Sequence, residues 1–204
     1  ISKEKQLDEL IKKLNEKSII AVDTETSSLN PQEADLVGIS LCYEANEAFY
    51  IPVGHTEKTE LKKDIVLKKL KPLLEDPSIK KVGQNIKYDF IIFKNHGIEL
   101  SSVEDTMLLS YTLDAGNNRH NMDTLSELHL GHKTISYKDL VGTGKKQLNF
   151  SEVDLKSATE YAAEDADITL RLYEVLSERV SKEKLEKIYE EFEKPMIKIL
   201  SKLE

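Results

Sequence analysis

The stretch that decides the fold is Ile19-Ile20-Ala21-Val22-Asp23-Thr24-Glu25-Thr26, an unbroken apolar run that ends in two acids. Such a run is typical of a central strand buried on both faces of a sheet. Side chains two residues apart on a strand point to the same face, so Asp23 and Glu25 converge on one side. Seen alone, an acidic pair of this kind is also typical of an exposed strand end.

Two further acids interrupt apolar patterns elsewhere in the chain. Asp89 follows the turn Gly83-Gln84-Asn85 and lies about one turn into a predicted helix. Asp165 falls on the buried stripe of a long predicted helix, and Tyr161 lies one turn earlier on a neighbouring part of that face. Each segment alone is weak, because Asp is common early in helices and a helical tyrosine usually packs. Their combination with the acidic pair predicts one site built from three separated segments.

Four inward-pointing carboxylates without counter-ions would repel one another strongly. Two carboxylates about 5 Å apart repel by roughly 3 kcal/mol at an effective dielectric constant near 20. Several such pairs would cost about as much as the net stability of a domain. Two divalent cations would offset the four charges, and oxygen-only ligands favour Mg²⁺, with Mn²⁺ as the alternative. The acids therefore predict a two-metal site of the kind that supports in-line displacement at phosphorus.

The rest of the sequence predicts an α/β domain whose sheet mixes antiparallel hairpins with parallel crossovers and is flanked by helices. The predicted elements are a lead-in helix over 3–16, strands over 18–25, 36–43 and 47–53, a helix from 60 capped by Thr59 and broken near Pro72, a strand over 80–83, helices over 86–95, 105–114 and 122–130, a loop-rich stretch over 131–150, and a helix over 154–180. A last helix, capped by Ser181 and kinked at Pro195, carries an apolar stripe without an evident partner.

Composition narrows the class of protein. The chain has 204 residues, 39% of them hydrophobic and 32% charged, which predicts a folded globular domain. No apolar run approaches the roughly 20 residues that span a bilayer, and the single Cys42 predicts a reducing, cytoplasmic setting. A zinc site at His129 and His132 is not favoured, since no cysteine lies nearby. The net charge of −8 argues against a stand-alone nucleic-acid binder.

The acidic segments resemble the Exo I, II and III motifs of the DEDD superfamily of 3′–5′ exonucleases, in its tyrosine subtype. The surrounding sequence looks like the proofreading domain of bacterial DNA polymerase I, from about residue 17 to the end of the chain. The stretches that carry this resemblance are Asp23-Thr24-Glu25-Thr26, Lys71-Pro72-Leu73-Leu74-Glu75-Asp76, Val82-Gly83-Gln84-Asn85, Asp105-Thr106-Met107-Leu108 and Tyr161 through Asp167. Residues 1–182 would form the exonuclease domain, and residues 183–204 resemble the start of a truncated polymerase domain. Because Ile1 is not typical of a native start, we expect an excised piece.

This resemblance implies a ribonuclease-H-like fold and a set of roles. Asp23, Glu25 and Asp165 would hold the first metal ion. Asp23 would bridge to a second ion supported by Asp89, and Tyr161 would orient the attacking water. The residues implied near the bound strand are Leu29, Gln84, Asn85 and Tyr88.

The reaction implied is hydrolysis of the last phosphodiester at a single-stranded 3′ end of DNA, with release of a nucleoside monophosphate. The implied setting is bacterial and nucleoid-associated, as a monomeric fragment whose partner is the polymerase domain of a parent chain, with no membrane. Three alternatives stay open at this point. They are a ribonuclease-D-like RNA exonuclease, a catalytically silent scaffold for a polymerase domain, and a metal-dependent phosphatase.

Overall fold

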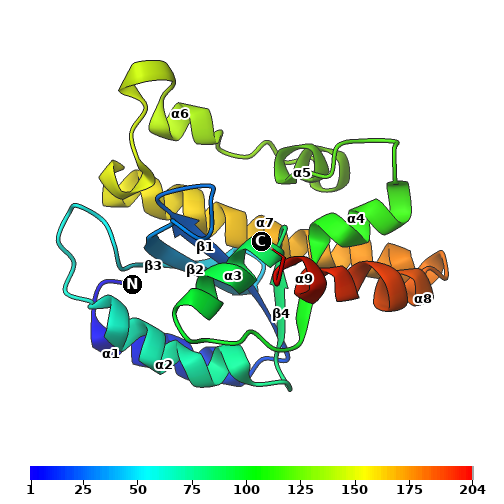
Figure 1. Ribbon diagram of the computed structural model, residues 1–204, viewed down its shortest axis with the longest axis horizontal. Coiled ribbons are helices and arrows are strands. Elements are labelled where there is room, and N and C mark those ends of the chain that lie inside the picture. The colour runs from blue at the N-terminus through cyan, green and yellow to red at the C-terminus, as the bar shows by residue number, and fades with distance from the viewer. Residues whose placement is uncertain (204) are drawn as a thin grey trace.

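The computed structural model describes residues 1–203 and contains a five-stranded mixed sheet between two layers of helices (Figure 1). The strand order is β3-β2-β1-β4-β5, so the strand that carries the acidic pair is central. Neighbours β1, β2 and β3 pair antiparallel, whereas β1, β4 and β5 pair parallel. The strands are β1 Ile19–Thr26, β2 Leu36–Glu44, β3 Glu47–Pro52, β4 Lys80–Gly83 and β5 Val103–Asp105. The predicted mixed α/β class is confirmed.

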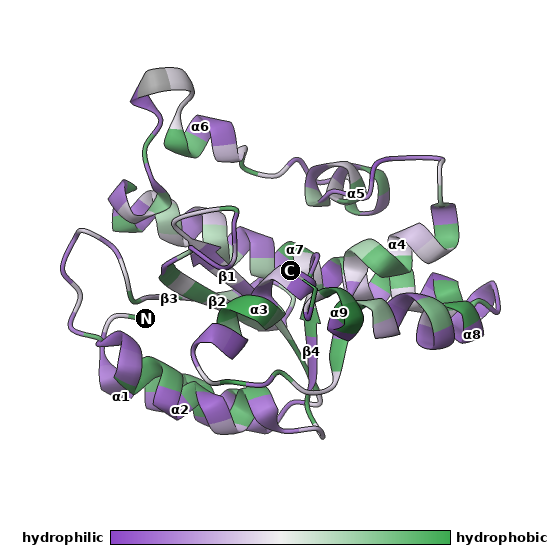
Figure 2. Cartoon of the chain, viewed as in Figure 1, coloured by the Kyte–Doolittle hydropathy of each residue, from purple (hydrophilic) through white to green (hydrophobic). Residues whose placement is uncertain are grey.

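Helices α1 and α2 are amphipathic, as their alternating colours in Figure 2 show, and both bury leucine side chains in the core. The helices of the chain are α1 Glu4–Asn15, α2 Lys63–Glu75, α3 Lys87–Asn95, α4 Thr106–Asp114, α5 Met122–Leu130, α6 Tyr137–Val141, α7 Leu155–Lys182, α8 Glu186–Ile188 and α9 Lys194–Leu200. Short 3₁₀ turns lie at Gly144–Lys146 and Phe150–Glu152, and a π-helical segment lies at Tyr189–Glu193. No helix in this described part of the chain is long and apolar enough to cross a bilayer.

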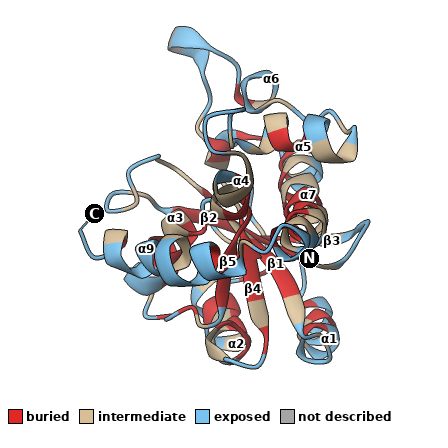
Figure 3. Cartoon of the chain, turned by 90° about the vertical axis from the view of Figure 1, so that its right-hand side faces the viewer, coloured by how far each residue is buried: buried red, intermediate tan, exposed pale blue. Residues whose placement is uncertain are grey.

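The alternation along β1 explains the two layers. Ile20 and Val22 face the cluster formed with α1, α2 and α3, while Ala21 packs against Ala166 and Leu170 of α7. The small alanine side chains allow α7 to lie close over the sheet. Figure 3 shows α7 and the α1–α2 pair on opposite sides of the buried strands. The acidic residues of β1 therefore face α7, the helix that carries Asp165.

Most predicted elements are confirmed within a residue or two, but the helix predicted from residue 60 is not. It begins at Lys63, and Thr59 bonds to the carbonyl of Leu61 instead of capping a helix. The predicted break at Pro72 is wrong, because α2 continues to Glu75. Leu73 and Leu74 are buried in the core beyond the proline. Their packing outweighs the one backbone hydrogen bond that a proline removes.

Two other regions differ from the sequence predictions. Strand β5 was missed because it has three residues, too few for a periodic pattern, and it runs directly into α4. The stretch 131–150, predicted to be loop-rich, contains the short helix α6 and two anchoring side chains, Val141 and Phe150, in a satellite core.

The C-terminal segment is also more broken than predicted. Ser181 lies inside α7 and caps nothing, and the chain turns at Lys184, whose φ is 59°. Pro195 lies in the first turn of α9, which follows the π-helical segment Tyr189–Glu193 without a break in the helical backbone. The apolar stripe is largely exposed, as predicted, at Ile188, Phe192, Met196, Ile199 and Leu203.

Candidate active site

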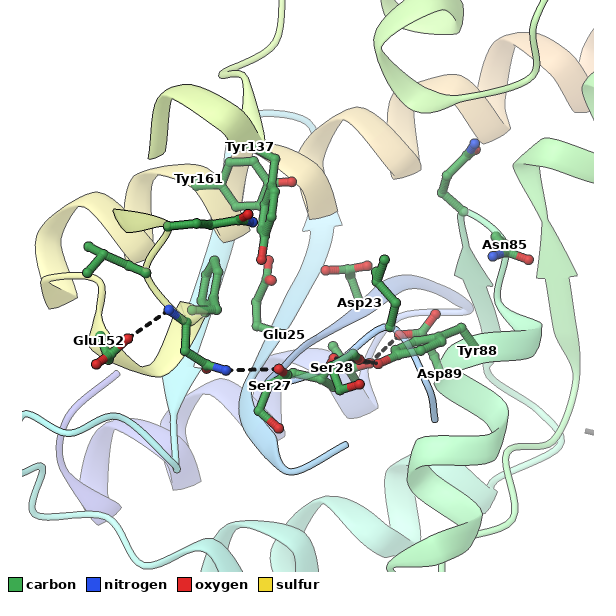
Figure 4. A pocket seen from close by; sticks show the side chains of 18 of the residues that line it. Asp23, Glu25, Ser27, Ser28, Asn85, Tyr88, Asp89, Tyr137, Glu152 and Tyr161 are labelled. Atoms are coloured by element: carbon green, nitrogen blue, oxygen red, sulfur yellow. Dashed lines mark hydrogen bonds between the residues drawn. The ribbon is translucent and has the colours of Figure 1, made fainter. Parts of the chain in front are cut away.

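A cavity of about 930 Å³ opens at the carboxyl end of β1. Its floor contains Asp23 and Glu25 from β1, and Asp89 approaches from α3 (Figure 4). Tyr137 and Tyr161 stand on the opposite side, above Glu25 in this view. Because β1 and β4 are parallel, the turn after β4 and the start of α3 reach the same edge of the sheet. Three separated segments thus meet at one edge, as the sequence predicts.

Three of the predicted acids form a tight cluster. Ligand oxygens of Asp23, Glu25 and Asp165 all lie within 4.8 Å of one another. The first two share a face of β1, and Asp165 comes from α7, which crosses that face. We refer to Asp23, Glu25 and Asp165 as the acidic triad.

Asp89 lies apart from the triad and is held differently. It is 2% exposed, and its Oδ1 accepts a hydrogen bond of 2.5 Å from the hydroxyl of Thr24. Burial, followed by the charge of Asp23, raises its pKa well above the ordinary value, while the Thr24 bond opposes the shift. The charge of Asp23 therefore acts on Asp89, although Asp89 does not belong to the triad.

Burial and mutual repulsion perturb the triad. Desolvation raises the pKa of Asp23 to about 6, although Ser40 and the Thr24 backbone lower it. The pKa of Glu25 lies well above its ordinary value because of burial and the charges of Asp23 and Asp165. The pKa of Asp165 is raised in the same way, by burial and by Asp23. A positive charge bound beside the three acids would favour their ionised forms.

The donor set fits a hard divalent cation. The triad offers only carboxylate oxygens, which Mg²⁺ and Mn²⁺ prefer over nitrogen or sulfur ligands. A cation would also relieve the repulsion that raises the three pKa values. His132, by contrast, bonds to Glu164 at 2.8 Å, a contact that gives no support to zinc binding.

Tyr161 lies at the edge of the cavity, one helical turn before Asp165, and the two side chains are close enough to shift each other's pKa. Burial and the charges of Asp165 and Glu25 raise the pKa of its phenol far above the ordinary value. The phenol is therefore neutral at physiological pH and acts as a hydrogen-bond donor, not as a base. Its ring meets Tyr137 edge-on, with ring centroids 5.9 Å apart, and lies 6.0 Å from the ring of Phe150.

The four residues predicted near the bound strand all line the cavity. Leu29 is 97% exposed at the loop after β1 and is free to meet a ligand. Asn85 is exposed in a left-handed conformation, with φ of 57°. Gln84 is already engaged, because its amide donates to His120 and its carbonyl accepts from Thr106 at 2.5 Å.

Tyr88 also has a structural contact. Its hydroxyl donates to the carbonyl of Ser28 and lies 2.5 Å from the hydroxyl of Thr26. These bonds fasten the loop that presents Leu29 to the start of α3. The polar groups of Gln84 and Tyr88 are therefore bonded within the protein, and both residues line the cavity.

Sequence reasoning missed the far wall of the cavity. Tyr137, Leu148, Asn149 and Phe150 line it, and all lie in or beside the stretch predicted to be loop-rich. The rings of Tyr137 and Phe150 stack with centroids 6.4 Å apart, and the Asn149 amide donates to the carbonyl of Ser27. Two aromatics in an irregular stretch were the available signal, but their partners are distant in sequence.

A mixed sheet of order β3-β2-β1-β4-β5, flanked by helices and with an acidic cluster at the end of its first strand, is a ribonuclease-H-like arrangement. The profile of a family described as 3′-5′ exonuclease matches residues 1–181. The chain belongs to this 3′–5′ exonuclease family.

Known proteins agree with this assignment. The chain is 43% identical over 218 residues to DNA polymerase I of Rhizobium leguminosarum, covering 97% of this chain and 22% of that protein. Among solved structures, Brucella melitensis NrnC has a TM-score of 0.70 at 24% identity, with 91% and 82% of the two chains covered. Trypanosoma brucei RNase D has a TM-score of 0.72 at 19% identity, with 91% and 70% covered. The two structural likenesses show the fold alone, whereas the polymerase relative supports the family.

Proposed function

We propose that this chain hydrolyses the 3′-terminal phosphodiester bond of DNA with divalent metal ions and releases nucleoside monophosphates. The observation that carries the proposal is the acidic triad beside Tyr161 on the floor of an open cavity. A cavity of about 930 Å³ has room for a few nucleotides at the end of a strand, not for a duplex.

The proposed roles follow from the geometry. The three triad carboxylates would hold one ion, and Asp23 with Asp89 would hold a second through the side that faces α3. Bound divalent ions would supply positive charge against the scissile phosphate and its leaving oxygen. The chain supplies fixed carboxylates, whose positions are set by β1 and by the packing of α7 on it.

Tyr161 would orient the attacking water. Its phenol is neutral, lies next to Asp165 in the triad, and stands at the cavity edge. The oxygen of a neutral phenol in this place can accept a hydrogen bond from a water molecule beside the triad. The phenol then orients the water without removing a proton from it. Loss of the hydroxyl is therefore expected to cost less than loss of a triad acid.

The substrate end would lie between two walls. Leu29 projects from one side, and the Tyr137–Phe150 stack with Leu148 forms the other. Apolar and aromatic walls suit unpaired bases, which stack on such side chains without strict sequence preference. The walls would therefore accept any frayed 3′ end.

DNA is the favoured substrate over RNA. The chain is 43% identical to a DNA polymerase I over 97% of its length, against 19% identity to an RNase D structure. Turnover of DNA and RNA oligonucleotides of one sequence, compared directly, separates these two functions. Faster hydrolysis of the RNA would overturn the substrate assigned here.

A polymerase domain in a longer parent chain would deliver the substrate. The chain spans 22% of the length of the Rhizobium relative, and its own net charge is −8. An acidic surface holds DNA poorly, so proofreading would depend on a neighbouring domain that grips the duplex. This isolated chain is expected to bind single-stranded DNA weakly, and submicromolar affinity at physiological salt would contradict that expectation.

The test of the proposed function is a time course on a 5′-labelled single-stranded oligonucleotide with Mg²⁺. A ladder that shortens by single nucleotides from the 3′ end is expected, and it should vanish with EDTA and in Asp23→Ala. A catalytically silent scaffold would leave the oligonucleotide intact in every lane. A phosphatase would release inorganic phosphate from nucleoside monophosphates and leave the oligonucleotide intact.

A further inference from the structure

A buried acid outside the triad joins two elements that border the active site. Asp105, the last residue of β5, is 1% exposed. Its Oδ1 accepts backbone N–H bonds from Asn85 at 3.1 Å, Met107 at 2.8 Å and Leu108 at 3.4 Å. Its Oδ2 accepts the N–H of Ile86 at 3.0 Å. One carboxylate therefore caps α4 and fastens the turn that precedes α3.

That turn controls the side of the cavity formed by α3. Asn85 adopts a left-handed backbone, which asparagine tolerates better than most residues with a side chain, and its N–H bond to Asp105 holds the turn in this conformation. Gly83, two residues before Asn85, leaves no room for a Cβ, which would lie 2.7 Å from the side chain of Ile86. Tyr88 and Asp89 follow within the first turn of the helix. A shift in the turn would therefore move the residues that face the triad.

Tyr189 holds Asp105 in place from the C-terminal segment. The Tyr189 hydroxyl accepts the backbone N–H of Asp105 at 3.0 Å and donates to Glu104 Oε2 at 2.9 Å. Glu104 Oε1 in turn accepts from Lys194 at 2.9 Å. Tyr189 and Glu104 are 3% and 4% exposed, so water does not substitute for these bonds. Strand β5 is an edge strand of the sheet, so its outward backbone N–H groups have no neighbouring strand to bond among the described residues. The Tyr189 hydroxyl accepts one of these N–H groups, that of Asp105.

The C-terminal segment is anchored on both sides of the sheet. Tyr189 packs in the cluster that contains Leu109 of α4 and Leu172 of α7. Ile197 of α9 belongs to the other cluster, with Ile92 of α3. Figure 1 shows α9 beside α3, and the π-helical segment Tyr189–Glu193 contacts α4. The segment thus connects to the site through side chains from both layers.

We propose that Tyr189, Glu104 and Asp105 form a positioning relay through which the C-terminal segment holds the Asn85–Asp89 side of the active site in place. This inference rests on the proposed function, because it concerns the same site. None of the three residues touches the cavity, so the relay acts through the turn and not on the substrate.

The relay makes a kinetic prediction that plain destabilisation does not. If the turn is competent for a smaller fraction of the time, the apparent affinity for ligands falls by that fraction, while saturating ligand restores the competent state. Tyr189→Phe is therefore expected to raise the KM for a short oligonucleotide about fivefold, and the Mg²⁺ concentration at half-maximal activity similarly, with kcat changed less than about twofold.

The experiment compares Tyr189→Phe with two control variants of the same 204-residue chain. Tyr43→Phe removes an equivalent hydroxyl bond to Glu47 on an exposed hairpin far from the site. Leu10→Ala destabilises α1 by core truncation without touching the relay. Steady-state kinetics are paired with hydrogen exchange of peptides that cover residues 84–92, which reports on the turn independently of activity.

Raised KM and faster exchange at residues 84–92 in Tyr189→Phe alone would support the relay. Unchanged KM with unchanged exchange would overturn it, as would the same changes in Leu10→Ala. If the wild-type chain has no nuclease activity, the proposed function fails. Exchange at residues 84–92 then still decides whether Tyr189 holds the turn.

Discussion

Asp105 and the acidic triad are both buried and both lie at the carboxyl end of the parallel strands, but their surroundings differ. Asp105 receives four backbone N–H bonds, and these bonds limit the rise of its pKa to about 6 despite almost complete burial. Glu25 and Asp165 face other carboxylates instead, and their pKa values lie well above the ordinary range. The fold supplies four backbone donors to Asp105, whereas Glu25 and Asp165 receive no comparable set from the described residues.

This difference separates a structural acid from a functional one. A carboxylate that caps a helix and fastens a turn stabilises the fold directly. Carboxylates that repel one another reduce stability and persist where a cation or substrate compensates. Removing the structural acid should therefore weaken the fold, whereas removing a triad acid should abolish activity and relieve repulsion.

The largest expected effect is on activity. Asp165→Asn should lower kcat/KM for a single-stranded oligonucleotide by about 10³-fold or more, because one ligand of the proposed cation site is lost. The matched control is Asp8→Asn, which removes an exposed acid of α1 that pairs with Lys69 of α2. This variant should leave kcat/KM unchanged. Comparable activity of Asp165→Asn and wild type would remove the triad from the mechanism.

The second-largest effect is expected on stability, because Asp105 accepts hydrogen bonds, whereas the triad acids repel one another. Asp105→Ala leaves four backbone N–H groups without their acceptor, and we expect a loss of about 3 kcal/mol in the free energy of unfolding. Urea denaturation at pH 7.5 measures it. A loss below about 1 kcal/mol would mean that the turn and the α4 cap do not depend on this carboxylate.

The pH dependence of stability sharpens the comparison. The folded-state pKa of Asp23 is about 6, against an ordinary 3.8, so the folded chain binds more protons than the unfolded chain between those values. Its stability contribution is therefore present at low pH and lost as pH rises through about 6. Without metal, this shift alone should lower the free energy of unfolding by about 1 kcal/mol between pH 5 and pH 8, and the raised pKa values of Glu25 and Asp165 should add to the fall. A flat or rising profile would contradict the raised pKa values.

The smallest effect is expected at the cavity rim. Leu29 is 97% exposed, so Leu29→Ala should change the free energy of unfolding by less than about 0.5 kcal/mol. Loss of one apolar contact with the terminal bases should raise the KM for the oligonucleotide about fivefold. An unchanged KM would remove Leu29 from the substrate wall and leave the triad account intact.

The sequence predicted the acidic residues of the site better than the residues that hold them in position. Asp23, Glu25 and Asp165 were found because periodicity within one strand or one helix assigns each a face. Asp105 was not found as a support, because its partners Asn85 and Ile86 lie far away in sequence. The roles proposed for these residues and the domain boundary after residue 182 remain predictions.

Other misses have the same origin. The continuation of α2 past Pro72 depends on core packing that no local rule contains. The Tyr137–Phe150 stack joins two short pieces of an irregular stretch. Local signals such as caps, prolines and periodicity therefore located the elements, whereas tertiary contacts decided their ends and built the cavity walls.

The most direct test of the central claim is the effect of Mn²⁺ on the free energy of unfolding at pH 7.5, measured for wild type and Asp23→Asn. Without metal, the variant should be the more stable of the two, because it carries one repelling charge fewer. Saturating Mn²⁺ should stabilise wild type by about 2 kcal/mol or more and the variant by much less. Equal stabilisation of both chains, or a wild type that is indifferent to Mn²⁺, would contradict the assignment of the acidic triad as a metal site.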